Sequence, residues 1–169
     1  MHEAPSCDRA CAVLELDLES ENATRDLALA LARVLEAGDV VGLEGGLGAG
    51  KTTFTRAAVH GLGLSERVAV TSPTFALLHQ YQGRLPIAHI DLYRLADEVE
   101  LEELGLDELL DQGAVAFVEW GRKFAAMAER THIWIELDIV SDDSRHARLI
   151  SQGARGEAIL SALRERFSP

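Results

Sequence analysis

The chain has 169 residues, of which 47% are hydrophobic, and a formal net charge of −12 at pH 7. This length suits one domain with a substantial buried core. The acidic balance argues against a chain that holds nucleic acid by itself, because such binding uses clustered Lys and Arg, and no apolar run has the length that spans a bilayer. We therefore expect a cytoplasmic protein.

The N-terminal residues 1–12 are expected to be flexible, followed by a single domain over residues 13–169. Cys7 and Cys11 lie in this first stretch. Two cysteines alone cannot supply a four-ligand zinc site. A redox pair is one interpretation, and incidental thiols near a chain terminus are the favoured one.

The first predicted elements are a strand, a helix and a second strand. Apolar and acidic residues alternate over residues 13–18, which indicates a half-buried strand. Ser20 is a suitable N-cap for a helix whose apolar residues repeat at helical spacing until Gly38. A short apolar strand over residues 39–44 follows.

A glycine-rich segment comes directly after this strand and fits the pattern G-x-x-x-x-G-K-[ST]. In such a loop the backbone N–H groups surround phosphates, Lys51 reaches the outer phosphates and the Thr52 hydroxyl binds Mg²⁺. A glycine-rich turn without a ligand is the alternative. The residues of this predicted phosphate loop are Gly45, Gly46, Leu47, Gly48, Ala49, Gly50, Lys51 and Thr52.

The rest of the chain continues to alternate between helices and strands. We expect a helix over residues 51–60, a loop at 71–74, a hairpin of strands at 75–81 and 87–90, helical segments within 98–111 and a buried strand at 114–118. A helix at 121–129, strands at 132–140 and 145–151 and a helix at 156–167 complete the order. This order predicts an α/β fold, a three-layer P-loop NTPase-like domain with a mixed central β-sheet flanked by helices.

Two acidic residues, Asp91 and Glu119, each follow a predicted apolar strand. P-loop proteins commonly place a carboxylate at such a strand end, where it coordinates the metal or orients water. The alternative for each is a solvated strand end. Trp120 either stacks on the base or fills the core, and His89 is either a partner of the site or a packed histidine.

Two further segments leave alternatives open. Ser72 and Thr74 flank Pro73 and suit a switch segment that senses the γ-phosphate, or an ordinary proline turn. Arg94 suits phosphate neutralisation or a surface ion pair. The acidic residues of segment 98–111 form either the solvated face of a helix or a surface for a partner.

These pieces together resemble the TsaE family, also called YjeE, of small bacterial P-loop ATPases. The resemblance covers about residues 20–120. The matching residues are GGLGAGKTT at 45–53, SPT at 72–74, HIDLYRL at 89–95, EELG at 102–105 and VEW at 118–120. The P-loop is shared by many families, whereas HIDLYR followed by VEW is far more particular.

The resemblance implies a cytoplasmic protein that binds ATP with Mg²⁺ and hydrolyses it weakly. It implies a role in threonylcarbamoyladenosine modification of tRNA at the adenosine beside the anticodon. TsaE-like proteins support turnover of the TsaB and TsaD partners and do not transfer the threonylcarbamoyl group themselves. Contact with tRNA is then expected only through these partners, and none with a membrane.

Residue roles follow from the same resemblance. Lys51, Asp91 and Glu119 are expected to be catalytic, with Asp91 in a Walker-B-like role. Metal contacts are expected from Thr52, Glu119 and Asp91, and a mobile switch loop from Ser72 and Thr74. Thr53 and Trp120 are expected to lie near the nucleotide, and Glu21 at its adenine side.

One departure stands in the loop, where Gly46 replaces the Asp that the family often has. Two other interpretations of the nucleotide site remain. A small-molecule kinase would need a lid rich in arginine, and no such segment follows the loop. A nucleotide-gated binding switch would require only the ATP-bound state.

Overall fold

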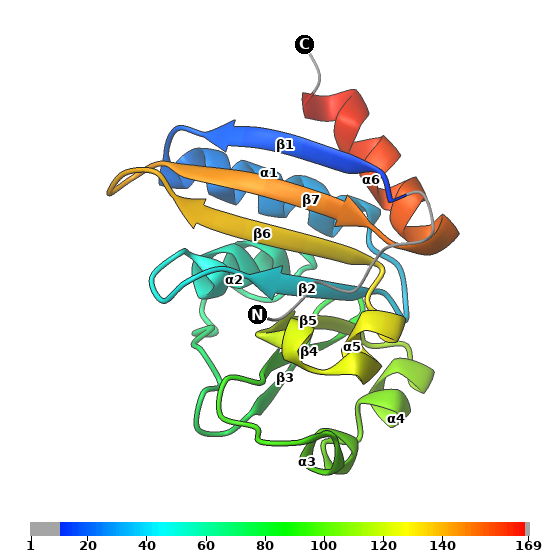
Figure 1. Ribbon diagram of the computed structural model, residues 1–169. Helices are drawn as coiled ribbons and strands as arrows, with labels where there is room; N and C mark the ends of the chain where they lie inside the picture. Colours follow the sequence, from blue (N-terminus) through cyan, green and yellow to red (C-terminus); the bar gives the residue numbers. More distant parts are fainter. Residues whose placement is uncertain (1–10, 168–169) are drawn as a thin grey trace, which may run out of the picture.

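Seven strands form one sheet in the order β1-β7-β6-β2-β5-β4-β3 (Figure 1). The computed structural model describes residues 11–167. The expected flexible N-terminus and Cys7 therefore lie outside the described residues, apart from residues 11 and 12. Cys11 is described and is not a free thiol, so the interpretation as an incidental thiol is wrong there.

The elements follow the predicted order. The strands are β1 (Val13–Leu18), β2 (Val40–Glu44), β3 (Leu78–Gln82), β4 (Pro86–Asp91), β5 (Val115–Glu119), β6 (Ile133–Ile139) and β7 (Arg145–Ser151). The helices are α1 (Glu21–Val34), α2 (Lys51–Gly61), α3 (Glu98–Glu103), α4 (Leu106–Asp111), the 3₁₀ turn η1 (Gly121–Lys123), α5 (Ala125–Arg130) and α6 (Gly153–Phe167).

The sheet is mixed, as predicted. Strand β2 pairs in parallel with β5 and β6, and β4 pairs in parallel with β5. The pairs β3–β4, β6–β7 and β1–β7 are antiparallel. Every residue of β5 is buried, as expected for a strand covered on both faces. Because β2, β5 and β4 are parallel neighbours, their carboxyl ends lie side by side at one edge of the sheet.

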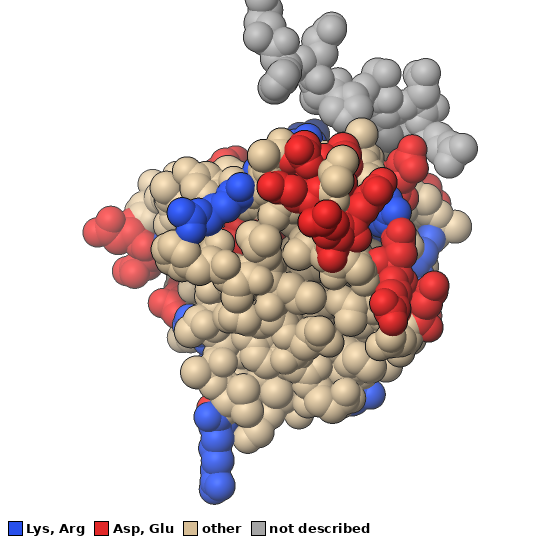
Figure 2. Space-filling model, turned by 90° about the horizontal axis from the view of Figure 1, so that it is seen from below, with Lys and Arg blue, Asp and Glu red and all other residues tan. Residues whose placement is uncertain are grey.

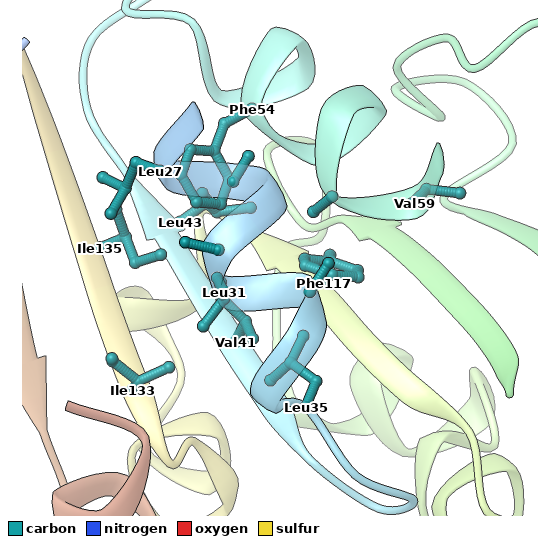
Figure 3. Close-up of a cluster of buried hydrophobic side chains, with 14 of the residues drawn as sticks. Leu27, Leu31, Leu35, Val41, Leu43, Phe54, Val59, Phe117, Ile133 and Ile135 are labelled. Carbon is teal, nitrogen blue, oxygen red and sulfur yellow. The ribbon is translucent and has the colours of Figure 1, made fainter. Parts of the chain in front are cut away.

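Helices cover both faces of the sheet. On one face, α1, α2 and α6 enclose the larger core cluster. Figure 3 shows Leu27 and Leu31 of α1, and Leu35 directly after the helix, directed at the strands, whose Val41 and Ile135 belong to the same core cluster. The spacing of four residues between Leu27 and Leu31 places them on one side of the helix. This confirms the three-layer arrangement.

The second face carries the shorter helices α3, α4 and α5. Leu101 and Leu106 are buried in this smaller core, while most acidic residues of segment 98–111 are exposed. Gly105 separates α3 from α4 with φ 68°. Figure 2 shows Asp and Glu side chains gathered on the side of α3 and α4, next to a broad area without charged residues. This is the solvated helix face; a docking role stays a prediction.

Several predicted boundaries are wrong. Helix α1 ends at Val34 and not at Gly38, because Leu35 leaves the helical region and the Asp39 carboxylate accepts the Glu36 N–H, which closes a turn. Strand β3 begins at Leu78, because Leu77 has φ 64° and donates its N–H to the Pro73 carbonyl. Residues 121–129 divide into η1 and α5, and α6 begins at Gly153.

In the part of the chain that the structure describes, we find no helix whose length and apolar character would let it cross a membrane.

Candidate nucleotide-binding site

The predicted phosphate loop connects β2 to α2. Gly45, Gly48 and Gly50 have φ of 145°, 78° and 104°, a range that side chains other than glycine rarely adopt. At Gly45 a Cβ atom would also lie 2.4 Å from the Leu137 carbonyl oxygen of β6. Helix α2 begins at Lys51 without a side-chain cap, so its first N–H groups are free for an anion.

Lys51 lies across this loop and is 5% exposed. Its Nζ donates to the carbonyl oxygens of Gly45 at 2.7 Å and Gly46 at 2.9 Å. It also lies 4.3 Å from the ring centroid of Trp120. Burial lowers the pKa of Lys51, and the nearby carboxylates, Glu119 foremost, partly oppose this shift. A phosphate group would compete with two neutral carbonyls for this ammonium group.

Glu119 is fixed beside Thr52 by two hydrogen bonds. Its Oε1 accepts from the Thr52 hydroxyl at 3.1 Å and contacts His89 Nε2 at 2.8 Å. His89 is fully buried. Since an ionised carboxylate only accepts, His89 Nε2 donates this bond, and the buried Nδ1 has no hydrogen-bond partner among the described residues. His89 is therefore a partner of the site and not merely a packed ring.

Asp91 lies next to Glu119 in the register of β4 and β5, but it makes different contacts. Its Oδ2 accepts from the hydroxyls of Ser72 at 3.0 Å and Thr74 at 2.9 Å, and its Oδ1 accepts the Tyr93 N–H. The two hydroxyls also lie 2.8 Å apart. Asp91 thus fastens the predicted switch segment to the end of β4.

Trp120 completes the site from the end of β5. Its backbone has φ 62°, and its N–H donates to the Leu43 carbonyl. The Tyr93 ring lies 5.1 Å from its ring. The cavity of about 320 Å³ so formed is lined by Leu47, Gly48, Gly50, Lys51, Thr52, Thr53, Ser72, Thr74, Asp91, Tyr93, Glu119 and Trp120.

The structure thus brings most of the predicted site residues together at one pocket. Gly45, Gly46 and Ala49 belong to the same loop but do not line the pocket. Glu21 is not among the lining residues either, and it lies at the exposed start of α1. A larger cavity of about 410 Å³ lies between β3, β4 and α4. Its lining residues carry no lysine, arginine or carboxylate, whereas the smaller pocket is lined by Lys51, Asp91 and Glu119.

The donor set can be compared with the needs of Mg²⁺. Within residues 11–167, no group of three or more His, Cys, Asp or Glu is arranged to hold a metal ion. The Thr52 hydroxyl and the Glu119 carboxylate are hard oxygen donors in mutual contact. Mg²⁺ bound with nucleotide commonly takes few protein ligands and completes its shell with phosphate oxygens and water, so these residues fit the ion.

Sequence analysis missed one residue that contacts the loop. Arg145, at the start of β7, donates from Nε to the Ala49 carbonyl oxygen at 2.8 Å and from Nη2 to that of Gly48 at 3.3 Å. Arg145 is far from the loop in sequence and belongs to no recognised motif. Only the pairing of β7 with β6 brings it to the site.

Comparison with known proteins gives a consistent result. Residues 18–148 match the family described as threonylcarbamoyl adenosine biosynthesis protein TsaE. The tRNA threonylcarbamoyladenosine biosynthesis protein TsaE of Bacillus subtilis is 38% identical over 141 residues, which cover 83% of this chain and 87% of the relative. That of Treponema pallidum is 41% identical over 113 residues, 67% and 82% of the two chains.

A solved structure is similar as well. The crystal structure of YdiB from Bacillus subtilis superposes with a TM-score of 0.77 at 30% identity, covering 94% of this chain and 99% of the other. The similarity therefore extends over nearly the whole of both chains.

Proposed function

The chain belongs to the TsaE family of threonylcarbamoyl adenosine biosynthesis proteins, and from this premise we propose that it binds ATP with Mg²⁺ and hydrolyses it in support of tRNA modification. Its relatives are named for tRNA threonylcarbamoyladenosine biosynthesis, and its role lies in the same process. The observation that carries the ATPase proposal is the convergence of Lys51, Thr52 and Glu119 in one pocket.

The phosphates would be held by the loop and the start of α2. The Lys51 ammonium group lies over the loop and donates hydrogen bonds to two carbonyl oxygens. A bound triphosphate replaces these neutral acceptors with charged ones, which form stronger hydrogen bonds with an ammonium group. Lys51 therefore needs little movement to contact the phosphates.

The two carboxylates have separate tasks in this proposal. Thr52 and Glu119 would hold the magnesium ion, which would neutralise part of the charge on the phosphates. Asp91 acts on the nucleotide through the hydroxyls of Ser72 and Thr74, whose positions it fixes. His89 keeps Glu119 oriented toward Thr52.

Homologues of TsaB and TsaD are the proposed partners, in the cytoplasm. ATP hydrolysis by this chain would let the partner complex turn over repeatedly, while the transfer of the threonylcarbamoyl group takes place on the partner. The net charge of −12 agrees with this division of labour, because the basic surface that tRNA needs can belong to another protein.

The experiment compares phosphate release from ATP and Mg²⁺ by the purified protein, alone and with TsaB and TsaD. Lys51→Ala should lose ATP binding, because the phosphates lose their buried cation. Arg33→Ala is the matched control, since Arg33 is an exposed cation in the last turn of α1. Equal ATP binding and hydrolysis by Lys51→Ala and the control would refute the proposal.

A further inference from the structure

Arg145 joins the phosphate loop to the turn between β6 and β7. Nε and Nη2 of its guanidinium group donate to the carbonyl oxygens of Ala49 and Gly48. Nη1 donates to three carbonyl oxygens of the turn, those of Ser141 at 2.9 Å, Asp142 at 3.2 Å and Ser144 at 2.8 Å. One planar side chain thus bridges two segments that are not joined by sheet pairing.

The bond to Ala49 sets the direction of the next N–H group. Cis peptide bonds are absent from the described residues, so the N–H of Gly50 points opposite to the Ala49 carbonyl across a planar trans peptide. Because Arg145 holds that carbonyl, the Gly50 N–H is directed away from the guanidinium group. Gly50 lines the nucleotide pocket, where an inward N–H is available to a phosphate oxygen.

The loop needs such an outside restraint at this point. Ala49 stands between Gly48 and Gly50, both of which have positive φ. Glycines have the widest choice of backbone conformations, so a peptide between two of them is free to rotate unless it is held. Apart from those with Arg145, the described hydrogen bonds of residues 48–50 are those of Ala49 N–H to Gly46 and of Phe54 N–H to Gly50, whereas the Lys51 ammonium group holds the carbonyl oxygens of Gly45 and Gly46 earlier in the loop.

The charge of Arg145 differs from that of the nearby Arg148 in its partners. Arg148, on the same strand, pairs with Glu15 and Glu136. Arg145 contacts carbonyl oxygens, and no carboxylate of residues 11–167 lies within ion-pair distance of it. Its charge is therefore not neutralised locally, and it adds a positive potential behind a loop that receives anions.

We propose that Arg145 is a positioning residue of the phosphate loop. It sets the Ala49–Gly50 peptide for a phosphate group and links the loop to the β6–β7 turn. The ligand is the phosphate chain of a nucleotide, so the proposal rests on the proposed ATP binding. The positioning itself is a property of the nucleotide-free protein and is measured without ATP.

Two variants test the proposal. Arg145→Lys keeps the charge, but one ammonium group cannot reach both the loop and the turn; Arg145→Met removes the charge as well. Arg148→Lys and Arg148→Met are the matched controls, because Arg148 lies on the same strand and makes only ion pairs at the surface. Amide hydrogen exchange and ATP affinity by calorimetry are measured for all four variants and the unmodified chain.

We expect faster exchange at residues 46–50 in both Arg145 variants, with exchange in β2, β5 and β6 unchanged. ATP binding should weaken roughly tenfold in Arg145→Lys and further in Arg145→Met. Loop exchange and ATP affinity equal to those of the Arg148 controls would overturn the proposal. So would a uniform rise in exchange across the sheet, because that marks a general loss of stability. An unmodified chain that fails to bind ATP refutes the proposed function, whereas the exchange result still decides the positioning role.

Discussion

Glu119 should have two separable roles, as a hydrogen-bond acceptor that stabilises the fold and as a charge that the magnesium ion needs. Its Oε1 accepts from Thr52 and from the buried His89. Glu119→Gln keeps an oxygen at that position and removes only the charge. Glu119→Ala removes the acceptor and leaves a buried His89 N–H without a partner.

The expected magnitudes follow from these contacts. An orphaned buried donor costs about 1–3 kcal/mol, so Glu119→Ala should lower the free energy of unfolding by at least that amount. Glu119→Gln replaces a charged hydrogen bond with a neutral one, a difference of about 1 kcal/mol. Removal of a charge that is only 3% exposed offsets part of this loss. Both variants should lose Mg²⁺-dependent hydrolysis, by roughly a hundredfold or more.

Urea unfolding and phosphate release measure the two effects independently. The account requires Glu119→Gln to be close to the unmodified protein in stability and close to Glu119→Ala in activity. If Glu119→Gln hydrolyses ATP at the original rate, Glu119 is not a magnesium contact. If both variants are equally destabilised, the hydrogen bond to His89 does not contribute in the way described.

Three other predictions concern single residues. Nucleotide binding should change the fluorescence of Trp120, because the Lys51 ammonium group lies 4.3 Å from the ring centroid of Trp120. Trp120→Phe should abolish this change, and a change that persists through the buried Trp134 would contradict the prediction. Burial lowers the pKa of His132 below its usual value, so the stability that neutral His132 contributes is complete above about pH 6.5 and is lost as the pH falls below that value. Between about pH 7.5 and 5.5, the free energy of unfolding in urea should therefore fall less in His132→Gln than in the unmodified chain. Equal decreases in the two proteins would refute this cause. Gly42→Ala should cost about 1–3 kcal/mol in thermal or urea unfolding, because its Cβ would lie 2.1 Å from a ring carbon of Trp134, and unchanged stability would contradict the packing seen.

The sequence predicts that Lys51, Thr52, Asp91 and Glu119 lie close together, because local motifs and buried strands carry strong signals, and the structure places these residues around one pocket. A glycine-rich loop after an apolar strand permits few alternatives, and two apolar strands ending at Asp91 and Glu119 had to meet at one edge of the sheet. Lys51 and Thr52 followed from the loop itself. The parallel centre and the helices on both faces followed from the same alternation.

The contacts that depend on tertiary structure were not predictable in this way. The role of Arg145 arises only because β7 folds back on β6 and brings its first residue to the loop. Strand β3 begins at Leu78 and not at residue 75, because Leu77 has φ 64°, a backbone conformation that its residue type does not favour. Whether Asp91 contacts a switch loop or a metal depended on side-chain hydrogen bonds that no sequence pattern encodes.

The central claim is that ATP hydrolysis at this loop supports repeated rounds of tRNA modification. The most direct measurement is the number of modified tRNA molecules formed per partner complex, with TsaB and TsaD present and this chain added in its unmodified form or as Lys51→Ala. The account predicts many rounds with the unmodified chain and ATP, and no more than one round with Lys51→Ala. Equal numbers of rounds with the two forms would contradict it.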